Sequence, residues 1–387
     1  MKTHNKRAGL PMLAAITLTL GGCALPVADQ PAIVVGPPTQ QASDATPRPA
    51  SPPEQRPTTH PATIPPHSAA ATAPPPGEPA VLKPGQFTWH PERAPQGSVM
   101  VVVSLSDQRA RVYRNGVLIG RTTVSTGRPD HETPTGVFTI LQKQVQHAST
   151  LYNSAPMPYM ERLTWDGVAL HAGNLPGYPA SHGCVRLPYE FSKRLYSVTA
   201  SGTTVVISKA HLPPLTLSQP DALLAINAAA RPLPAAAKDD YFWRPQRSPT
   251  GPLTVLLSSA DRTMYVYRNG VLIGRAPVRI SGPDTHLGSS VYKLLAGYLD
   301  APSPLAPNRP ARRWMAVGMS GDHGQTTVPP NLAGRLRLPP AFAQAVYDQL
   351  TPGAVLMTSD QPASRDTRTD RNFVVMTTSP HLAAAEQ

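Results

Sequence analysis

The chain has 387 residues, enough for two or three domains, and 48 of them are prolines. So many prolines indicate that part of the chain is low-complexity. The formal net charge of +12 suits an anionic neighbour such as a membrane surface, cell-wall polymer or nucleic acid, although an Arg-rich proteome explains it equally well. No dense Lys/Arg run occurs, so we expect no nucleic-acid partner.

Residues 1–23 have the pattern of a signal peptide, in which basic residues precede an apolar run from Leu10 to Leu20. The run ends in Leu20-Gly21-Gly22-Cys23, which resembles the lipobox of bacterial lipoproteins. The resemblance implies that Cys23 is lipidated and anchors the chain to a membrane. It also implies a periplasm-facing lipoprotein of the outer membrane, because no acidic residue follows Cys23 directly. The alternative is an ordinary signal peptide in which Cys23 is incidental.

Residues 24–96 are rich in Pro, Ala, Thr, Ser and Gln and have few aliphatic or aromatic residues. Such a segment cannot bury enough apolar surface to offset the entropy of ordering it. We therefore predict a long disordered Pro-rich linker that tethers the folded part to its anchor.

An internal repeat follows: the sequence VYRNGVLIGR occurs at Val112–Arg121 and again at Val266–Arg275. Ten identical residues indicate a duplicated module. In each copy apolar residues flank an Asn-Gly pair, Asn115-Gly116 in the first, which is the strongest short-range signal for a type I′ hairpin turn.

The rest of each copy is also β-rich, and the clearest helical pattern begins at Pro188, a residue type favoured at the start of a helix. We predict a mainly β chain with a short helix after Cys184. Its modules span 97–209 and 250–378, and a Pro/Ala-rich connector spans 210–249.

The second copy lacks reactive groups that the first one has. Aligning Gly183–Pro188 with Gly334–Pro339 places Arg335 opposite Cys184. We therefore predict that residues 250–378 form a degenerate, catalytically inactive repeat. Such a module would serve binding, packing or regulation, and its deletion would leave the chemistry of the first module intact.

A second alignment concerns the histidine of the first copy. Matching Trp165 with Trp314 places Ser320 opposite His171. On this alignment the repeat lacks the histidine as well as the thiol.

The chain has two cysteines, Cys23 in the leader and Cys184 in the first module, so we expect no disulfide framework. A thiol with its ordinary pKa near 8.5 is mostly protonated at neutral pH and needs a nearby base or positive potential to react. His171 and His182 are candidates for that base, and the helix after Pro188 would add a favourable dipole.

The segments Leu170-His171-Ala172-Gly173 and Ser181-His182-Gly183-Cys184-Val185-Arg186 resemble the catalytic signature of YkuD-type L,D-transpeptidases. The resemblance covers most of the first module and implies a YkuD-like β-sandwich. The gap between His171 and Cys184 is shorter than in many members, which implies a trimmed loop over the site.

The resemblance also assigns roles to these residues. Cys184 is the nucleophile, and His171 is the base, oriented by the backbone carbonyl near Ala172. The residues that shape the oxyanion pocket, contact the substrate or support the loop are His182, Gly183, Arg186 and Ser181. Gly183 would be glycine for close substrate approach or for a positive φ.

By resemblance, the chain is expected to transfer acyl groups from peptidoglycan tetrapeptide stems through a thioester, with no metal or organic cofactor. An amine of a second stem, a D-amino acid or an envelope lipoprotein would be the acceptor, whereas water would make the enzyme a carboxypeptidase. The non-enzyme alternative is a lipid-anchored peptidoglycan-binding protein. A zinc site or a merely buried Cys184 would also place a thiol beside histidines, but a structural zinc site requires four ligands.

Overall fold

The computed structural model describes residues 81–149, 154–209, 211, 216–218, 241–281, 286–303, 309–319, 336–363 and 376–377. All of them lie in one compact unit of the chain. The leader, Cys23 and the tether up to residue 80 lie outside these ranges. Within them, no helix has both the length and the apolar character needed to cross a bilayer.

The first module is built on a seven-stranded sheet with strand order β1-β4-β3-β2-β10-β5-β21. The central pair β2 and β10 is parallel, and the other neighbours are antiparallel. The strands are β1 (Phe87–Trp89), β2 (Val99–Ser104), β3 (Arg109–Arg114), β4 (Val117–Thr123), β5 (Gly136–Thr139), β10 (Thr204–Ser208) and β21 (Met376–Thr377).

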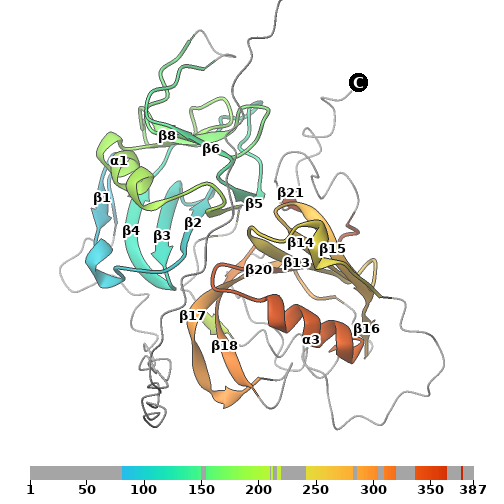
Figure 1. Ribbon diagram of the computed structural model, residues 1–387. Coiled ribbons are helices and arrows are strands. Elements are labelled where there is room, and N and C mark those ends of the chain that lie inside the picture. The colour runs from blue at the N-terminus through green and yellow to red at the C-terminus, as the bar shows by residue number, and fades with distance from the viewer. Residues whose placement is uncertain are drawn as a thin grey trace, which may run out of the picture. The chain divides into compact units, whose positions relative to one another are not determined.

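A smaller four-stranded sheet of the same module has the order β6-β7-β8-β9. Its strands are β6 (Gln142–Gln144), β7 (Met160–Arg162), β8 (Ala169–Ala172) and β9 (Val185–Leu187). Helix α1 (Tyr189–Val198) follows β9 directly, and Figure 1 shows it beside β1, β4 and β8.

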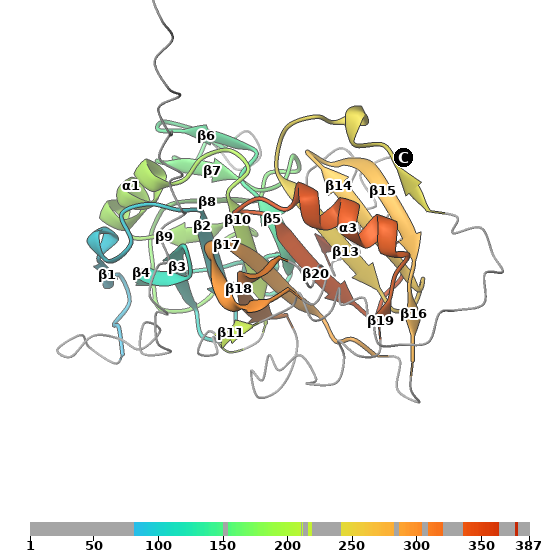
Figure 2. The same ribbon diagram turned by 60° about the horizontal axis from the view of Figure 1, so that its bottom comes forward.

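The second module repeats this plan on an eight-stranded sheet, with order β11-β18-β17-β20-β13-β14-β15-β12. Helix α3 (Pro340–Gln349) lies over β13, β14 and β15 (Figure 2). The strands are β11 (Thr216–Ser218), β12 (Phe242–Trp243), β13 (Leu253–Ser258), β14 (Thr263–Arg268), β15 (Val271–Pro277), β17 (Ser290–Pro302), β18 (Pro310–Gly318) and β20 (Val355–Ser359), with a separate pair β16 (Arg279–Ile280) and β19 (Leu336–Arg337).

Both predicted hairpins are confirmed. Strands β3 and β4 pair across Asn115-Gly116, and β14 and β15 pair across Asn269-Gly270. All four turn residues have positive φ, from 48° at Asn115 to 81° at Gly116, as a type I′ turn requires. The predicted helix after Cys184 is also confirmed, because α1 begins at Tyr189 with Pro188 as its N-cap.

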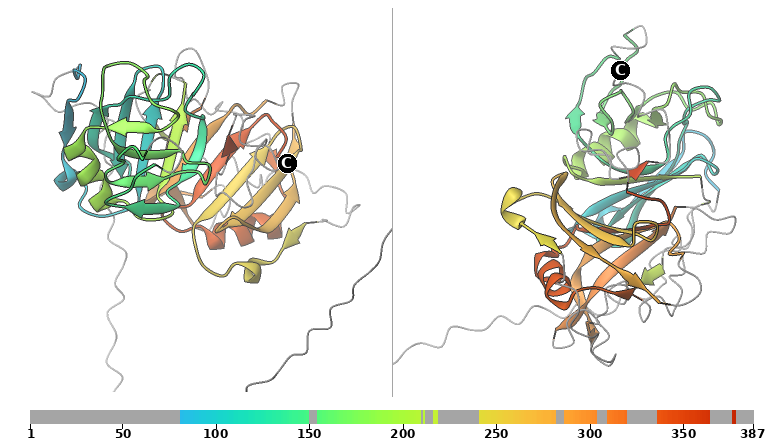
Figure 3. Two further views of the ribbon diagram at one scale, coloured as in Figure 1. Left: turned by 90° about the horizontal axis from the view of Figure 1, so that it is seen from above. Right: turned by 90° about the vertical axis from the view of Figure 1, so that its right-hand side faces the viewer.

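The apolar residues form three large clusters, one on each outer face and one between the two main sheets. In β2, Val101 and Val103 point to the cluster that contains α1, whereas Met100 and Val102 point to the cluster shared with the second module. This alternation follows from the two-residue period of a strand. Each main sheet is therefore covered by its own helix on one face and by the other module on the opposite face (Figure 3).

The predicted boundary of the tether at residue 96 is wrong. Residues 87–89 form β1 on the edge of the main sheet, and a 3-10 helix spans Pro91–Arg93. The folded part begins earlier because Phe87 and Trp89 pack against the core, where both rings contact Phe191 of α1 edge to face.

The second module also begins earlier than residue 250. Strand β12 and the 3-10 helix Pro245–Arg247 are the counterparts of β1 and Pro91–Arg93, and Trp243 meets Phe342 as Trp89 meets Phe191. The paired motifs Trp-x-Pro-x-Arg at 89–93 and 243–247 are the sequence signal for this.

Two short strands cross the predicted domain boundaries. Strand β11, within the predicted connector, pairs with β18 of the second module (Figure 2). Strand β21, assigned to the repeat by sequence, pairs instead with β5 of the first module (Figure 1). Both add to sheet edges whose backbone groups would otherwise lack partners, a demand that side-chain patterns do not reveal.

The alignment of Trp165 with Trp314 does not hold in three dimensions. Trp165 is 52% exposed in a turn after β7, whereas Trp314 is 1% exposed within β18 and pairs with Leu294. The correspondence of β9 with β19 does hold, because each precedes its helix. Arg335 and Ser320, placed opposite the first module's Cys184 and His171, lie outside the described residues.

Candidate active site

A pocket of about 500 Å³ opens over the small sheet of the first module. It is lined by all the predicted site residues of the first module except Gly183: Cys184, His171, His182, Arg186, Ser181 and Ala172. The structure therefore brings together two segments that are separate in sequence, the strand β8 and the loop before β9.

The parallel pairing of β8 and β9 creates this arrangement. It sets His171 opposite Arg186 and Leu170 opposite Val185, so Cys184, the residue before β9, lies next to Ala169 at the start of β8. Both strands are short, and one face of each packs against the core. The pairing register that places their apolar side chains in the core therefore also decides which side chains face the pocket.

His171 is 7% exposed, and its Nδ1 lies 2.8 Å from the carbonyl oxygen of Ala172. A carbonyl only accepts, so Nδ1 carries the proton and Nε2 keeps its lone pair. Burial lowers the pKa of His171 to about 4, against the opposing effect of this hydrogen bond. The imidazole is therefore a neutral, oriented acceptor at physiological pH.

Cys184 is the free cysteine of the described part of the chain, and its thiol lies 3.4 Å from the carbonyl oxygen of Gly167. Burial raises the pKa of Cys184 above its ordinary value, opposed by a backbone hydrogen bond at Ala169 and by Arg186. The site at rest therefore holds a thiol and a neutral imidazole.

The loop before Cys184 is held by Ser181, whose hydroxyl donates to the carbonyl of Cys184 at 2.5 Å and accepts from the backbone N–H of Gly183 at 3.2 Å. Gly183 has φ +108°, and a side chain there would meet no atom closer than 3.8 Å. Of the two reasons offered for this glycine, the structure supports the backbone conformation.

His182 differs from His171 in its surroundings. Its ring packs edge to face on His131 with 4.9 Å between centroids, and it is half-buried. Burial and nearby positive charge, first at Arg128, lower its pKa. His182 thus lines the pocket from the loop that precedes Cys184.

The sequence interpretation missed several residues of the pocket. Arg162 of β7 lines it and holds its guanidinium near the ring of Trp165 and on Gln142. Tyr189, at the start of α1, is exposed and also lines the pocket. Neither belongs to the His and Cys segments, and only the pairing of β7 with β8 reveals that Arg162 is near.

The buried His171 predicts an unusual acid limit for activity. An imidazolium cannot accept the thiol proton, so kcat/KM is expected to fall only as pH drops through about 4. The raised pKa of Cys184 moves the alkaline limit upward. A pH profile of kcat/KM measures both limits, and an acid limb near the ordinary imidazole value of about 6.5 would contradict the buried base.

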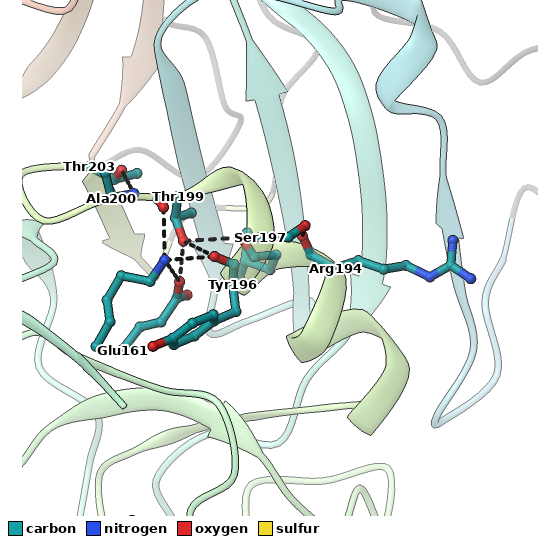
Figure 4. A network of polar contacts seen from close by, with 9 residues as sticks. Glu161, Arg194, Tyr196, Ser197, Thr199, Ala200 and Thr203 are labelled. Atoms are coloured by element: carbon teal, nitrogen blue, oxygen red, sulfur yellow. Dashed lines mark hydrogen bonds and ion pairs between the residues drawn. The ribbon is translucent and has the colours of Figure 1, made fainter. Parts of the chain in front are cut away.

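Behind the site, a buried network of polar contacts joins β7 to the end of α1 (Figure 4). Glu161 is 1% exposed, accepts from the hydroxyl of Thr199 and lies 3.8 Å from Lys143 Nζ. Lys143 donates to the carbonyl oxygens of Tyr196 at 2.6 Å and Thr199 at 2.8 Å, so it satisfies the C-terminal carbonyls of the helix.

The network predicts a pH-dependent stability. Burial raises the pKa of Glu161 to about 7, above its unfolded value of 4.5, so folding favours the protonated form. The raised pKa contributes on the order of 3 kcal/mol to the free energy of unfolding below pH 4.5. This contribution is lost as pH rises to about 7. Denaturant unfolding across this pH range should show a flatter dependence of stability on pH for Glu161→Gln. The control Glu190→Gln, at an exposed position of α1, should keep the dependence of the wild type.

Comparison with known proteins identifies a family that the first module resembles. The family model for the L,D-transpeptidase catalytic domain, YkuD, matches residues 98–207. L,D-transpeptidase 1 of Mycobacterium tuberculosis is 33% identical over 102 residues, which cover 22% of this chain and 41% of that protein. The chain thus spans less than half the length of this curated relative.

Solved structures give a similar partial match. An L,D-transpeptidase from Mycobacterium smegmatis is 22% identical and matches 29% of this chain and 58% of its own, with a TM-score of 0.28. The L,D-transpeptidase of Stackebrandtia nassauensis is 31% identical and matches 29% of this chain and 56% of its own, with a TM-score of 0.27.

Proposed function

We propose that this chain, whose residues 98–207 form a YkuD-type L,D-transpeptidase catalytic domain, is a cysteine-dependent L,D-transpeptidase of peptidoglycan tetrapeptide stems. The observation that carries the proposal is the shared pocket of Cys184, His171 and Arg186. It combines a nucleophile, an oriented neutral base and a guanidinium, which acyl transfer to a thiol requires.

The first step is attack of Cys184 Sγ on the carbonyl carbon of the bond between diaminopimelate and the terminal D-Ala. His171 Nε2 accepts the thiol proton and passes it to the D-Ala nitrogen as the C–N bond breaks. D-Ala leaves as an amine, and a thioester remains on Cys184. Attack by an acceptor amine reverses the proton path and restores the thiol.

The positive charges of the pocket suit this substrate. Arg186 and Arg162 both line the pocket. Arg186 lies beside Gly173, where an added side chain would come within 2.9 Å of the Cγ of Arg186. A guanidinium binds a carboxylate through two parallel hydrogen bonds. We assign these two arginines to the carboxylates of the stem peptide.

Mass spectrometry of the purified protein with a disaccharide-tetrapeptide tests the proposal, with Cys184→Ala as the matched control. Release of D-Ala with an adduct on Cys184 is expected for the wild type alone. The products then identify the acceptor, because a dimer, an exchanged stem and a free tripeptide correspond to a stem amine, a D-amino acid and water. A folded wild type without adduct or turnover would favour the peptidoglycan-binding alternative.

The cellular location is a separate proposal: a periplasm-facing lipoprotein of the outer membrane, anchored through Cys23. It rests on the segment Leu20-Gly21-Gly22-Cys23. Metabolic labelling with a palmitate analogue should mark the wild type and not Cys23→Ser. Label on both proteins would disprove the anchor without bearing on the chemistry of Cys184.

A further inference from the structure

A second cavity, of about 410 Å³, lies where the two modules meet and is distinct from the pocket of Cys184. Four turns line it: 97–99 and 200–203 from the first module, and 251–253 and 351–354 from the second. The turns correspond in pairs through the internal repeat, and each contains a glycine with positive φ. The cavity volume is typical of small-ligand sites.

The cavity contains one charged lining residue, Lys293 of β17. Its side chain is buried, with 4% exposure, and its Nζ donates to the hydroxyl oxygen of Thr204 at 2.7 Å. Among the described residues, no carboxylate forms an ion pair with it. An ammonium has three donors, and burying one without a counter-ion is costly.

A second polar group points to a ligand at the same place. The hydroxyl oxygen of Ser98 is buried and has no hydrogen-bond partner within the described part of the chain, and Ser98 lines the cavity. Buried polar atoms are paired in the great majority of native structures. The cavity thus offers an ammonium and a hydroxyl donor with no acid among its lining residues.

The repeat shows that the lysine is a specific feature of the second module. In the second module, Lys293 pairs with Val355 of β20. At the corresponding position of the first module, Thr139 pairs with Thr204 of β10. The first module therefore has a threonine where the second has the lysine. The cation is an addition to the common scaffold, placed where the two sheets meet.

We propose that the junction cavity binds a small oxyanion, a carboxylate or a phosphate, through Lys293 Nζ and Ser98 Oγ. The ligand would complete the donors that the protein leaves without an acceptor. Burial lowers the pKa of Lys293 to about 8, so the ammonium still predominates at neutral pH. Because both modules form the walls, the ligand binds the docked state and stabilises the whole protein.

Thermal unfolding of the full chain, with acetate and inorganic phosphate as probes at constant ionic strength, tests the site. We expect at least one probe to raise Tm with a saturable dependence in the wild type, and Lys293→Met to weaken that response at least about tenfold. Lys193→Met, which removes an exposed lysine of α1, should keep it. A response to one probe alone identifies the chemistry of the ligand as carboxylate or phosphate.

Two further variants keep the test independent of protein folding and of the active site. Ser98→Ala retains the lysine and should weaken the response, and Cys184→Ala should leave it unchanged. Failure of turnover therefore does not affect this result. The proposal is overturned if neither probe acts on the wild type, or if Lys293→Met and Ser98→Ala both respond as the wild type does.

Discussion

Replacing His171 with alanine is expected to slow acylation of Cys184 by roughly 10²- to 10⁴-fold, the usual contribution of a general base. The reason is structural: the hydrogen bond from Nδ1 to the carbonyl of Ala172 fixes the tautomer that presents a free Nε2. With the pKa of Cys184 raised by burial, few molecules carry a thiolate before substrate arrives. The base must therefore take the proton during attack.

The matched control is His182→Ala, because both histidines line the same pocket and only one is buried. The ring of His182 packs on His131 at the edge of the pocket. Removing it should therefore slow acylation of Cys184 much less than removing His171. Single-turnover formation of the Cys184 adduct, followed by mass spectrometry, measures the step directly. Equal losses from both variants would show that the proton path passes through His182.

Most of the predicted site residues line one pocket, and the sequence could locate them because they lie in two short segments. The segment 181–186 supplies the thiol, the glycine turn and the arginine within six positions. The ionisation of the site was not predictable in this way. The sequence offered candidate bases and a helix dipole to activate the thiol. The pKa shifts of Cys184 and His171, however, both follow chiefly from burial, which depends on the packing of β8 and β9.

The fold shows the same division between local and distant information. The Asn-Gly hairpins and the helix after Pro188 follow from turn chemistry and capping, so the sequence pattern located them correctly. The additions of β11 and β21 depend on which backbone edges lie open in three dimensions. Nothing in two or three residues of sequence specifies such a partner.

The relation between the modules follows from a feature of the strands. In β2 every residue is buried, because Val101 faces α1 and Val102 faces the second module. A run buried on both faces is typical of a central strand with covers on both sides. The second module is therefore a structural cover of the catalytic sheet, which changes the expectation that it is dispensable.

Deleting residues 241–387 is accordingly expected to unfold or strongly destabilise the catalytic module. Six of its side chains lie in the shared cluster: Met100, Val102, Tyr113, Leu118, Val137 and Val206. Burial of each such side chain contributes roughly 1.5–3 kcal/mol, whereas the whole stability of a domain is about 5–15 kcal/mol. Exposing even half of this face removes a large part of that stability, and the deletion also removes β21.

Point substitutions test the packing between the two modules without removing residues 241–387. Leu295 of β17 is buried against the Asn115-Gly116 turn, where a side chain on Gly116 would come within 2.7 Å of it, and Asn115 accepts from the backbone N–H of Ala296. Leu295→Asp should lower Tm sharply by burying an unpaired charge, whereas Tyr298→Asp on the same strand is exposed and should not.

Calorimetry of the full chain, the deletion and both point variants measures the coupling. A shared core predicts one cooperative transition for the full chain, lowered as a whole by Leu295→Asp. A truncated protein that unfolds cooperatively at the original Tm and keeps its turnover would show that the first module stands alone. In that case the burial of Val102 and Val206 against the second module would reflect docking of two independently stable domains, and the second module would be free to serve binding.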